Sequence, residues 1–338
     1  EKANGAMGST DIRRRVPPKE GEADTMNGSL KADSRDTAED SSTAASGPSK
    51  RLQISPLDVL ITVWNFSFFL LGGVISLVIQ LLIGTIGAPI LAFFPVTKMQ
   101  LMSASLKLPL AMCVWFNPFW HLKVVRRYVP PPPGERGRII LSNHLSGVDP
   151  WICNAAIAPY TAMFVFKSGL LNIPVLGWQL ALTGDIPIYF TKDKGGWGTM
   201  PGTTRKMFER VDEVVSKGIA VLAYPEGTRS RTGRLQPFKN GFFKYCVDSE
   251  TDIQPMIVHC TPRLWRPFSL LMGPGTCYAA FGDPISCKGR TMEEVRKATR
   301  EAMAQLLKLS PEYDEQLDAP MSDREDLAPQ QRGTSSWM

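Results

Sequence analysis

The stretch Asn143-His144-Leu145-Ser146-Gly147-Val148-Asp149 comes directly after the apolar run Ile139-Ile140-Leu141. A β-run that ends in a polar, glycine-containing turn can present an imidazole to a cleft. The spacing allows the Asp149 carboxylate to accept a hydrogen bond from the Nδ1–H of His144, which fixes the tautomer and leaves Nε2 as a general base. Alone this spacing is a weak signal, because it often arises by chance. It nevertheless makes His144 and Asp149 the candidate catalytic residues.

A second motif strengthens that interpretation. The stretch Tyr224-Pro225-Glu226-Gly227-Thr228-Arg229-Ser230 also follows an apolar β-like run. Gly227 permits a tight turn, and the guanidinium of Arg229 can hold a phosphate through two parallel hydrogen bonds. The plain alternative is a surface turn with an ordinary ion pair. Two such motifs in this order, both at strand ends, are much more specific than either one.

The two motifs resemble those of the glycerolipid acyltransferase family, most closely its lysophosphatidate (1-acylglycerol-3-phosphate) acyltransferases, over about residues 100–290. The resemblance implies an α/β fold, with a mixed central sheet flanked by helices and N-terminal helices embedded in a membrane. It implies acyl transfer from acyl-CoA or acyl-carrier protein to the sn-2 hydroxyl of lysophosphatidate, giving phosphatidate. By the same resemblance Arg229 binds the acceptor phosphate, while Glu226, Gly227 and Thr228 shape the glycerol site.

One segment departs from the family pattern. Members commonly carry a glycine-led β-run that ends in a phosphate-binding arginine, and here that run is Gly184 to Lys192 with Phe190 at the arginine position. Lys192 is a candidate substitute, although an ammonium lacks the guanidinium fork. Lys167 matches another basic position of the family. Both lysines are equally open to phosphate contact and to simple solvation.

The acceptor therefore stays open at this stage. Glycerol 3-phosphate or another lysophospholipid is an alternative acceptor for the same chemistry. A non-catalytic membrane-binding protein with the same fold is the alternative from another class. The sequence has no Gly-x-Ser-x-Gly motif for a protein nucleophile, which favours direct attack by the acceptor hydroxyl. The backbone amides of residues 145–148 are candidates for part of an oxyanion hole.

Composition limits the class of partner. The chain has 338 residues and a net charge of +6, which suits an anionic membrane surface or phospholipid head groups. Nucleic acid is disfavoured, because there is no basic stripe interleaved with aromatic residues and no zinc-ligand spacing. We expect no cofactor and no metal. The six cysteines are dispersed without a Cys-x-x-Cys pair, which favours reduced, buried thiols in a domain that faces a reducing compartment.

The chain divides into four parts by composition. Residues 1–50 are polar and predicted to be disordered, residues 51–100 anchor the protein in a membrane, residues 101–309 form the catalytic domain, and residues 310–338 are a loosely held polar tail.

The run Val59–Thr97 contains no charged residue and is nearly twice the ~20 residues that one membrane span needs. Whether it spans once or forms a hairpin, of a helix at about 59–83 and a shorter one to Phe94, stays open. The endoplasmic reticulum is the expected location, with the plastid envelope as the alternative.

Alternating apolar runs and helical patterns predict the remaining elements. A helix is expected at about Thr203–Lys217, another at Met292–Lys308, and an interfacial or buried helix at Leu108–Trp120. The expected strands are Ile139–Leu141, Thr161–Val165, Ile186–Phe190, Ile219–Tyr224, Pro255–His259 and Tyr278–Phe281.

Overall fold

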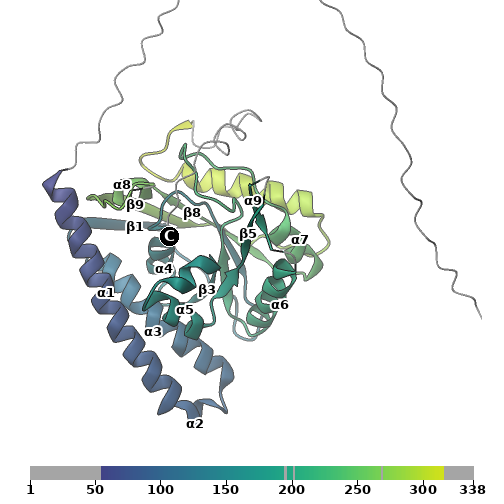
Figure 1. Ribbon diagram of the computed structural model, residues 1–338. Coiled ribbons are helices and arrows are strands. Elements are labelled where there is room, and N and C mark those ends of the chain that lie inside the picture. The colour runs from purple at the N-terminus through teal and green to yellow at the C-terminus, as the bar shows by residue number, and fades with distance from the viewer. Residues whose placement is uncertain (1–54, 194–195, 201, 268, 316–338) are drawn as a thin grey trace, which may run out of the picture. The chain divides into compact units, whose positions relative to one another are not determined.

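The computed structural model describes residues 55–193, 196–200, 202–267 and 269–315, with side chains left out for 191–199. Within them, a seven-stranded sheet forms the centre, in the order β1-β9-β8-β2-β7-β3-β4 (Figure 1). All neighbouring strands are parallel except β8 and β9. The predicted mixed α/β sheet is therefore confirmed. Its strands are β1 (Trp120–Arg126), β2 (Ile139–Ser142), β3 (Ala162–Lys167), β4 (Ile186–Ile188), β7 (Ala220–Ala223), β8 (Ile253–His259) and β9 (Gly275–Phe281).

Both faces of the sheet are covered, as parallel strands require. Side chains alternate between two cores: Ile140 belongs to the first, whereas Ile139 and Leu141 belong to the second. The first core is closed by α3 (Pro95–Trp115) and α4 (Asp149–Ile157). The second is closed by α6 (Thr203–Ser216), α7 (Gly241–Asp248) and α9 (Met292–Leu307). The shorter elements are η1 (Ser168–Asn172), α5 (Leu176–Thr183), α8 (Thr261–Leu264) and a hairpin of β5 (Phe190–Asp193) and β6 (Gly196–Thr199).

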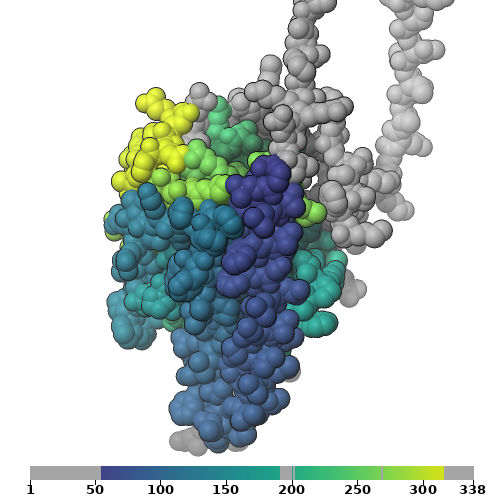
Figure 2. Space-filling model, turned by 90° about the vertical axis from the view of Figure 1, so that its left-hand side faces the viewer, coloured from purple at the N-terminus to yellow at the C-terminus, as the bar shows by residue number. Residues whose placement is uncertain are grey.

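The N-terminal helices form a hairpin. Helix α1 (Pro56–Thr85) runs to the short α2 (Ala88–Leu91), and α3 returns along it (Figure 1). Among the described residues, α1 is the one helix that is long and apolar enough to cross a bilayer. Large apolar side chains cover its outer surface, among them Leu60, Leu70, Leu71 and Ile75. In Figure 2, α1 (purple) lies along the surface of the molecule beside α3.

The inner face of α1 is polar. Its buried residues are Asp58, Ile61, Asn65, Gly73, Ser76 and Gln80. Asn65 accepts from the Asn117 amide at 2.6 Å, and the hydroxyl of Ser76 donates to the carbonyl of Ser105 at 2.6 Å. A helix that buries its polar side chains and exposes its apolar ones is arranged for an apolar surrounding, with polar contacts to the rest of the protein.

The largest differences from the expected elements are a divided strand, a helix with wrong bounds and a missed strand. The expected strand Ile186–Phe190 is divided, because Phe190 starts the separate β5 hairpin. Of the expected helix Leu108–Trp120, only the part up to Trp115 is helical, as the end of α3, which begins at Pro95 and continues through Pro109. Trp120 instead starts β1, a strand that the sequence did not indicate. Lys107 fits inside α3 because its ammonium pairs with Asp185 at 2.8 Å, with both side chains buried.

The remaining expectations concern the termini and the cysteines. Residues 1–50 and 316–338 lie outside the described residues. The start of the polar tail is held firmly, because the Ser310 hydroxyl is buried and lies 2.7 Å from Nδ1 of His259. All six cysteines are free and buried, as predicted.

Candidate active site

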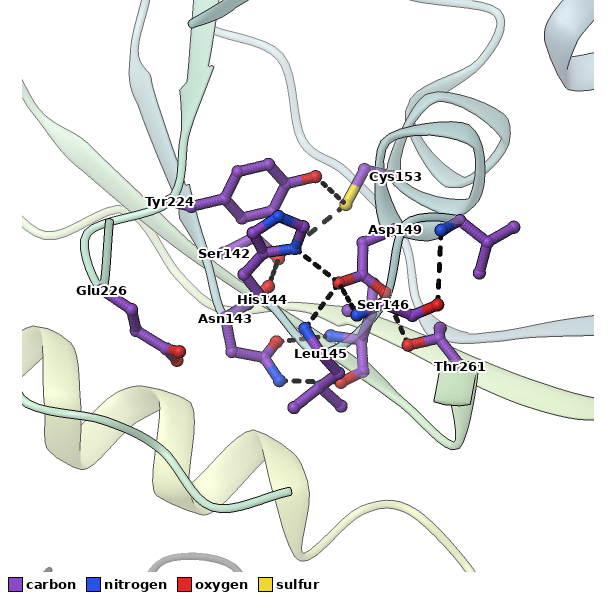
Figure 3. Close-up of polar contacts among 12 residues, drawn as sticks. Ser142, Asn143, His144, Leu145, Ser146, Asp149, Cys153, Tyr224, Glu226 and Thr261 are labelled. Carbon is purple, nitrogen blue, oxygen red and sulfur yellow. Dashed lines mark hydrogen bonds and ion pairs between the residues drawn. The ribbon is translucent and has the colours of Figure 1, made fainter. Parts of the chain in front are cut away.

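The carboxyl ends of four parallel strands bring the predicted site residues to one edge of the sheet. His144 follows β2, Tyr224 and Glu226 follow β7, Lys167 ends β3, and Thr261 follows β8. In open α/β sheets this edge is where ligands bind. The two motifs, which are far apart in the sequence, therefore lie next to each other in the fold (Figure 3).

Asp149 lies at the centre of the first motif. Its Oδ2 is 2.7 Å from Nδ1 of His144 and accepts from the backbone amides of Leu145 and Ser146 at 2.6 and 2.7 Å. Its Oδ1 accepts from the hydroxyl of Thr261 at 2.5 Å. Asp149 is fully buried, whereas the His144 side chain is 19% exposed. The contact predicted from the spacing is present, and it directs Nε2 away from Asp149.

An aromatic side chain also packs against the flat face of the His144 ring. Tyr224 stacks on it, with ring centroids 4.1 Å apart and ring planes 15° apart (Figure 3). The Tyr224 hydroxyl points to the thiol of Cys153 at 3.8 Å rather than to the imidazole. Burial raises the pKa of the Tyr224 phenol well above its usual range. The uncharged ring of Tyr224 therefore packs against the flat face of the imidazole and limits its movement.

Backbone contacts join the catalytic turn to its neighbours. The amide of Ser230 donates to the carbonyl of His144 at 2.7 Å, which connects the second motif to the first. On the other side, the Asn143 side chain exchanges two hydrogen bonds with the backbone of Val258 in β8, at 2.9 and 2.8 Å. The turn is thus fixed to β7 and β8 as well as to the strand that it follows.

Glu226 is a buried carboxyl, 2% exposed. Its Oε2 accepts from the Gln236 amide at 3.1 Å, and Oε1 has no hydrogen-bond partner among the described residues. Burial raises its pKa well above the usual range, against the lowering effect of Gln236 and of the His144 backbone. A neutral carboxyl can both donate and accept a hydrogen bond. In Figure 3, Glu226 lies on the opposite side of His144 from Asp149.

The other predicted binding residues lie on the surface near this edge. Gly227 adopts a left-handed conformation with φ of 70°, which explains the glycine in the turn. Gly227, Thr228 and Lys167 are exposed, and Arg229 is half-buried. The side chain of Lys192 lies outside the described part of the structure. The functional roles of these residues remain predictions.

The predicted oxyanion site is not supported for three of its amides. The N–H groups of Leu145 and Ser146 donate to Asp149, and the N–H of Val148 donates to the Ser146 hydroxyl at 3.3 Å. They are engaged inside the turn because the turn itself is folded around the carboxylate. The sequence spacing gave no indication of this.

The other histidines lie elsewhere. His121 is exposed on β1, and His259 contacts Ser310. No group of three or more His, Cys, Asp or Glu side chains suited to a metal ion occurs within the described ranges.

Two contributors to the site were missed by the sequence. Tyr224 is the first residue of the second motif but was given no role, so an aromatic residue directly before Pro225 is a signal that could have been used. Thr261 has no local signal, because its contact with Asp149 joins positions far apart in the chain.

Comparison with known proteins finds a matching family over the middle of the chain. The model of the Acyltransferase family matches residues 121–259. That range contains both motifs and the sheet edge on which they lie. This stretch of the chain is therefore similar to that family.

Two named relatives are similar to the same part of the chain. A 1-acyl-sn-glycerol-3-phosphate acyltransferase of Limnanthes douglasii is 31% identical over 161 residues, which is 48% of this chain and 54% of the relative. A chloroplastic 1-acyl-sn-glycerol-3-phosphate acyltransferase of Brassica napus is 30% identical over 133 residues, covering 39% of this chain and 36% of the relative. The chain thus spans about half, or less, of the length of these relatives.

A solved structure has the same fold. The crystal structure of the 1-acyl-sn-glycerophosphate acyltransferase PlsC from Thermotoga maritima superposes with a TM-score of 0.53 at 17% identity. The match covers 76% of this chain and 98% of that one.

Proposed function

We propose that this chain is an O-acyltransferase that moves an acyl group from acyl-CoA or acyl-carrier protein to the sn-2 hydroxyl of 1-acylglycerol 3-phosphate, giving phosphatidate. The observation that carries the proposal is the 2.7 Å contact between His144 and buried Asp149, beside the turn that bears Glu226 and Arg229. The names of the relatives supply the acceptor.

The proposed chemistry needs one base and no protein nucleophile. With Nδ1–H donating to Asp149, the Nε2 lone pair of His144 takes the proton of the acceptor hydroxyl as its oxygen attacks the thioester carbonyl carbon. The tetrahedral intermediate then expels the thiolate, which receives that proton from the imidazolium. Asp149 stabilises the imidazolium and keeps the ring in the productive tautomer. The products are the new ester and the free thiol.

The second motif holds the acceptor in this proposal. Arg229 grips its phosphate, with Lys167 and Lys192 as further cationic contacts, and Gly227 and Thr228 line the glycerol. Glu226, a buried carboxyl whose pKa is raised by burial and which has one oxygen unpartnered among the described residues, hydrogen-bonds a glycerol oxygen.

A second acceptor class is favoured by one observation. Phe190 occupies the position where the family pattern has an arginine, which removes one phosphate contact. This leaves the exact acceptor open, and because both motifs also serve relatives that use glycerol 3-phosphate or another lysophospholipid, these are the runner-up acceptors, which an acceptor panel separates from 1-acylglycerol 3-phosphate.

The outer surface of α1 supports a membrane location. Its exposed apolar side chains would lie in a bilayer, so that lysophosphatidate reaches the site without leaving the lipid. The endoplasmic reticulum is our proposed membrane, with the plastid envelope as the alternative.

Carbonate extraction of full-length protein tests integral anchoring: release from the membrane contradicts it. Single cysteines at Ser49 and Thr97 of a cysteine-free variant, labelled in sealed vesicles, report whether both ends of the apolar run lie on one side.

A thiol-release assay tests the chemistry. Purified protein receives acyl-CoA and, in turn, lysophosphatidate, glycerol 3-phosphate and other lysophospholipids, while a thiol-reactive dye reports the free thiol. His144→Ala should lose the roughly 10²–10⁴-fold contribution of a general base, with little change in melting temperature. Asp149→Asn should lose much of the rate by favouring the wrong tautomer. A His144→Ala rate above about a tenth of wild type contradicts the mechanism. Activity should also survive chelators, because the hydroxyl is activated by an imidazole.

A further inference from the structure

The segment from Cys260 to Gly273 lies between the catalytic turn and helix α1. It leaves β8 through Cys260, whose φ of 64° turns the chain sharply, and it continues into the short helix α8. In Figure 1, α8 lies beside the first turns of α1. Each side of this segment makes specific polar contacts.

On the catalytic side, Thr261 fixes the plane of the Asp149 carboxylate. Oδ2 faces His144 and two backbone amides, whereas Oδ1 accepts from the Thr261 hydroxyl at 2.5 Å (Figure 3). Both residues are fully buried. With donors at both oxygens, the carboxylate cannot rotate about its Cβ–Cγ bond without losing a charge-assisted hydrogen bond. Thr261 thereby determines how Asp149 presents Oδ2 to His144.

Trp265 holds the same turn at two further points. Its carbonyl accepts from the Ser146 hydroxyl at 2.5 Å. Its ring lies 3.4 Å from the position that a Cβ on Gly147 would occupy, so the ring packs directly on the turn. The segment and the catalytic turn therefore move together.

On its other side, the segment is fixed to α1. Arg266 pairs with Asp58 at 3.3 Å, and the amide of Met272 donates to the Thr62 hydroxyl oxygen at 2.8 Å. The ring of Phe66 meets that of Trp265 edge to face at 6.0 Å. Three successive turns of α1, at Asp58, Thr62 and Phe66, thus contact this one segment.

We propose that Thr261 is a positioning residue for the His144–Asp149 pair, and that helix α1 keeps it in place through the segment Cys260–Gly273. This inference rests on the proposed function of His144 and Asp149. It gives α1 a role in turnover that is separate from anchoring, because the same helix that faces the apolar surrounding holds the catalytic acid in place.

The first test removes the Thr261 hydroxyl. Thr261→Val should lower kcat about 10- to 100-fold, the range expected for a hydrogen bond to a charged group, with the KM of both substrates nearly unchanged. Thr261→Ser should restore most of the rate. The matched control is Thr299→Val, which replaces another fully buried threonine, one that bonds only within α9. Thr299→Val should keep the wild-type kcat.

A double-mutant cycle gives a readout that a purely structural role would not. In an Asp149→Asn background, Thr261→Val should lower kcat by much less than in the wild type, because it acts through Asp149. Equal losses in both backgrounds overturn the positioning role, and so does an unchanged kcat in Thr261→Val. If His144→Ala is inactive while Thr261→Val is normal, the inference fails and the proposed function stands. An active His144→Ala overturns the proposed function instead.

The second test addresses α1, and it stays informative if Thr261→Val does not fold. Thr62→Val removes the acceptor of the Met272 amide. Thr85→Val is its match on the same helix: both hydroxyls bond a carbonyl one turn earlier, at 2.6 and 2.7 Å. Thr62→Val should lower kcat several-fold, as expected for one neutral hydrogen bond, whereas Thr85→Val should not. Equal kcat values in the two variants, at equal membrane binding, overturn the link to α1.

Discussion

The backbone amide of Ser230 donates to the carbonyl oxygen of His144 at 2.7 Å. This bond ties the end of the second motif to the proposed base of the first, so the two motifs form one structural unit. A change in the turn that carries Glu226 and Arg229 is therefore expected to affect the orientation of His144 as well as acceptor binding. The variants below separate the two effects by comparing KM with kcat.

Tyr224 should contribute to turnover through its ring and not through its hydroxyl. Tyr224→Phe keeps the stack on His144 and should retain near wild-type kcat. Tyr224→Leu removes it and should lower kcat by up to about tenfold, the value of one aromatic pair. Steady-state kinetics on the two variants decides the matter. A large loss in Tyr224→Phe would instead assign a role to the hydroxyl near Cys153.

Glu226 should make the fold less stable as the pH rises. Its pKa is raised in the folded protein. At a pH between its pKa in the unfolded chain, about 4.3, and its higher pKa in the folded protein, the native state binds a proton on Glu226 that the unfolded state has released. Stability then falls with increasing pH. The melting temperature of Glu226→Gln should accordingly exceed that of the wild type by a margin that grows above about pH 4.3.

Thermal melts across this pH range provide the measurement. Glu209→Gln is the control, because Glu209 is exposed on α6. A margin for Glu226→Gln that shrinks with rising pH would mean that the buried carboxyl is ionised and stabilised in the folded state.

Arg229 should matter for acceptors that carry a phosphate. Arg229→Ala is expected to raise the acceptor KM about 10- to 100-fold, as for a lost charge-assisted hydrogen bond, and Arg229→Lys should rescue it only in part. Slow transfer to a monoacylglycerol, which has no phosphate, should barely change. Arg231→Ala, at an exposed neighbouring position, is the matched control. An equal loss of acyl-transfer rate with both acceptors would mean that Arg229 acts in folding or in binding the donor.

The buried pair of Lys107 and Asp185 should be essential to stability. Lys107→Met leaves Asp185 uncompensated inside the protein, although Thr183 and Phe164 still donate to it at 2.7 Å. We expect a loss of about 3–5 kcal/mol in unfolding free energy. Arg126→Met breaks the exposed pair with Asp283 and should cost at most about 1 kcal/mol. Chemical denaturation in detergent compares the two, and similar losses would contradict the role of the buried pair.

The sequence predicted the features that depend on local spacing. The His144–Asp149 contact is made within one turn, and the strands that carry both motifs are continuous apolar runs, so both could be recognised. Helix α3 could not be delimited, because Lys107 and Pro109 interrupt its pattern and the partner of Lys107 lies far along the chain. Strand β1 was missed because His121, Lys123 and Arg126 interrupt the continuous apolar run by which the other strands were recognised. Thr261 was missed because only the folded chain brings it to Asp149.

The polar inner face of α1 determines how a water-soluble form of this protein could be made. Deleting the helix would leave Arg266, Asn117 and the amide of Met272 without the partners that they have on Asp58, Asn65 and Thr62. Replacing its outward apolar residues, such as Leu60, Leu70 and Ile75, with polar ones would keep every one of those contacts. Redesign of the outer surface, rather than truncation, is therefore the route to a soluble protein that keeps its catalytic turn intact.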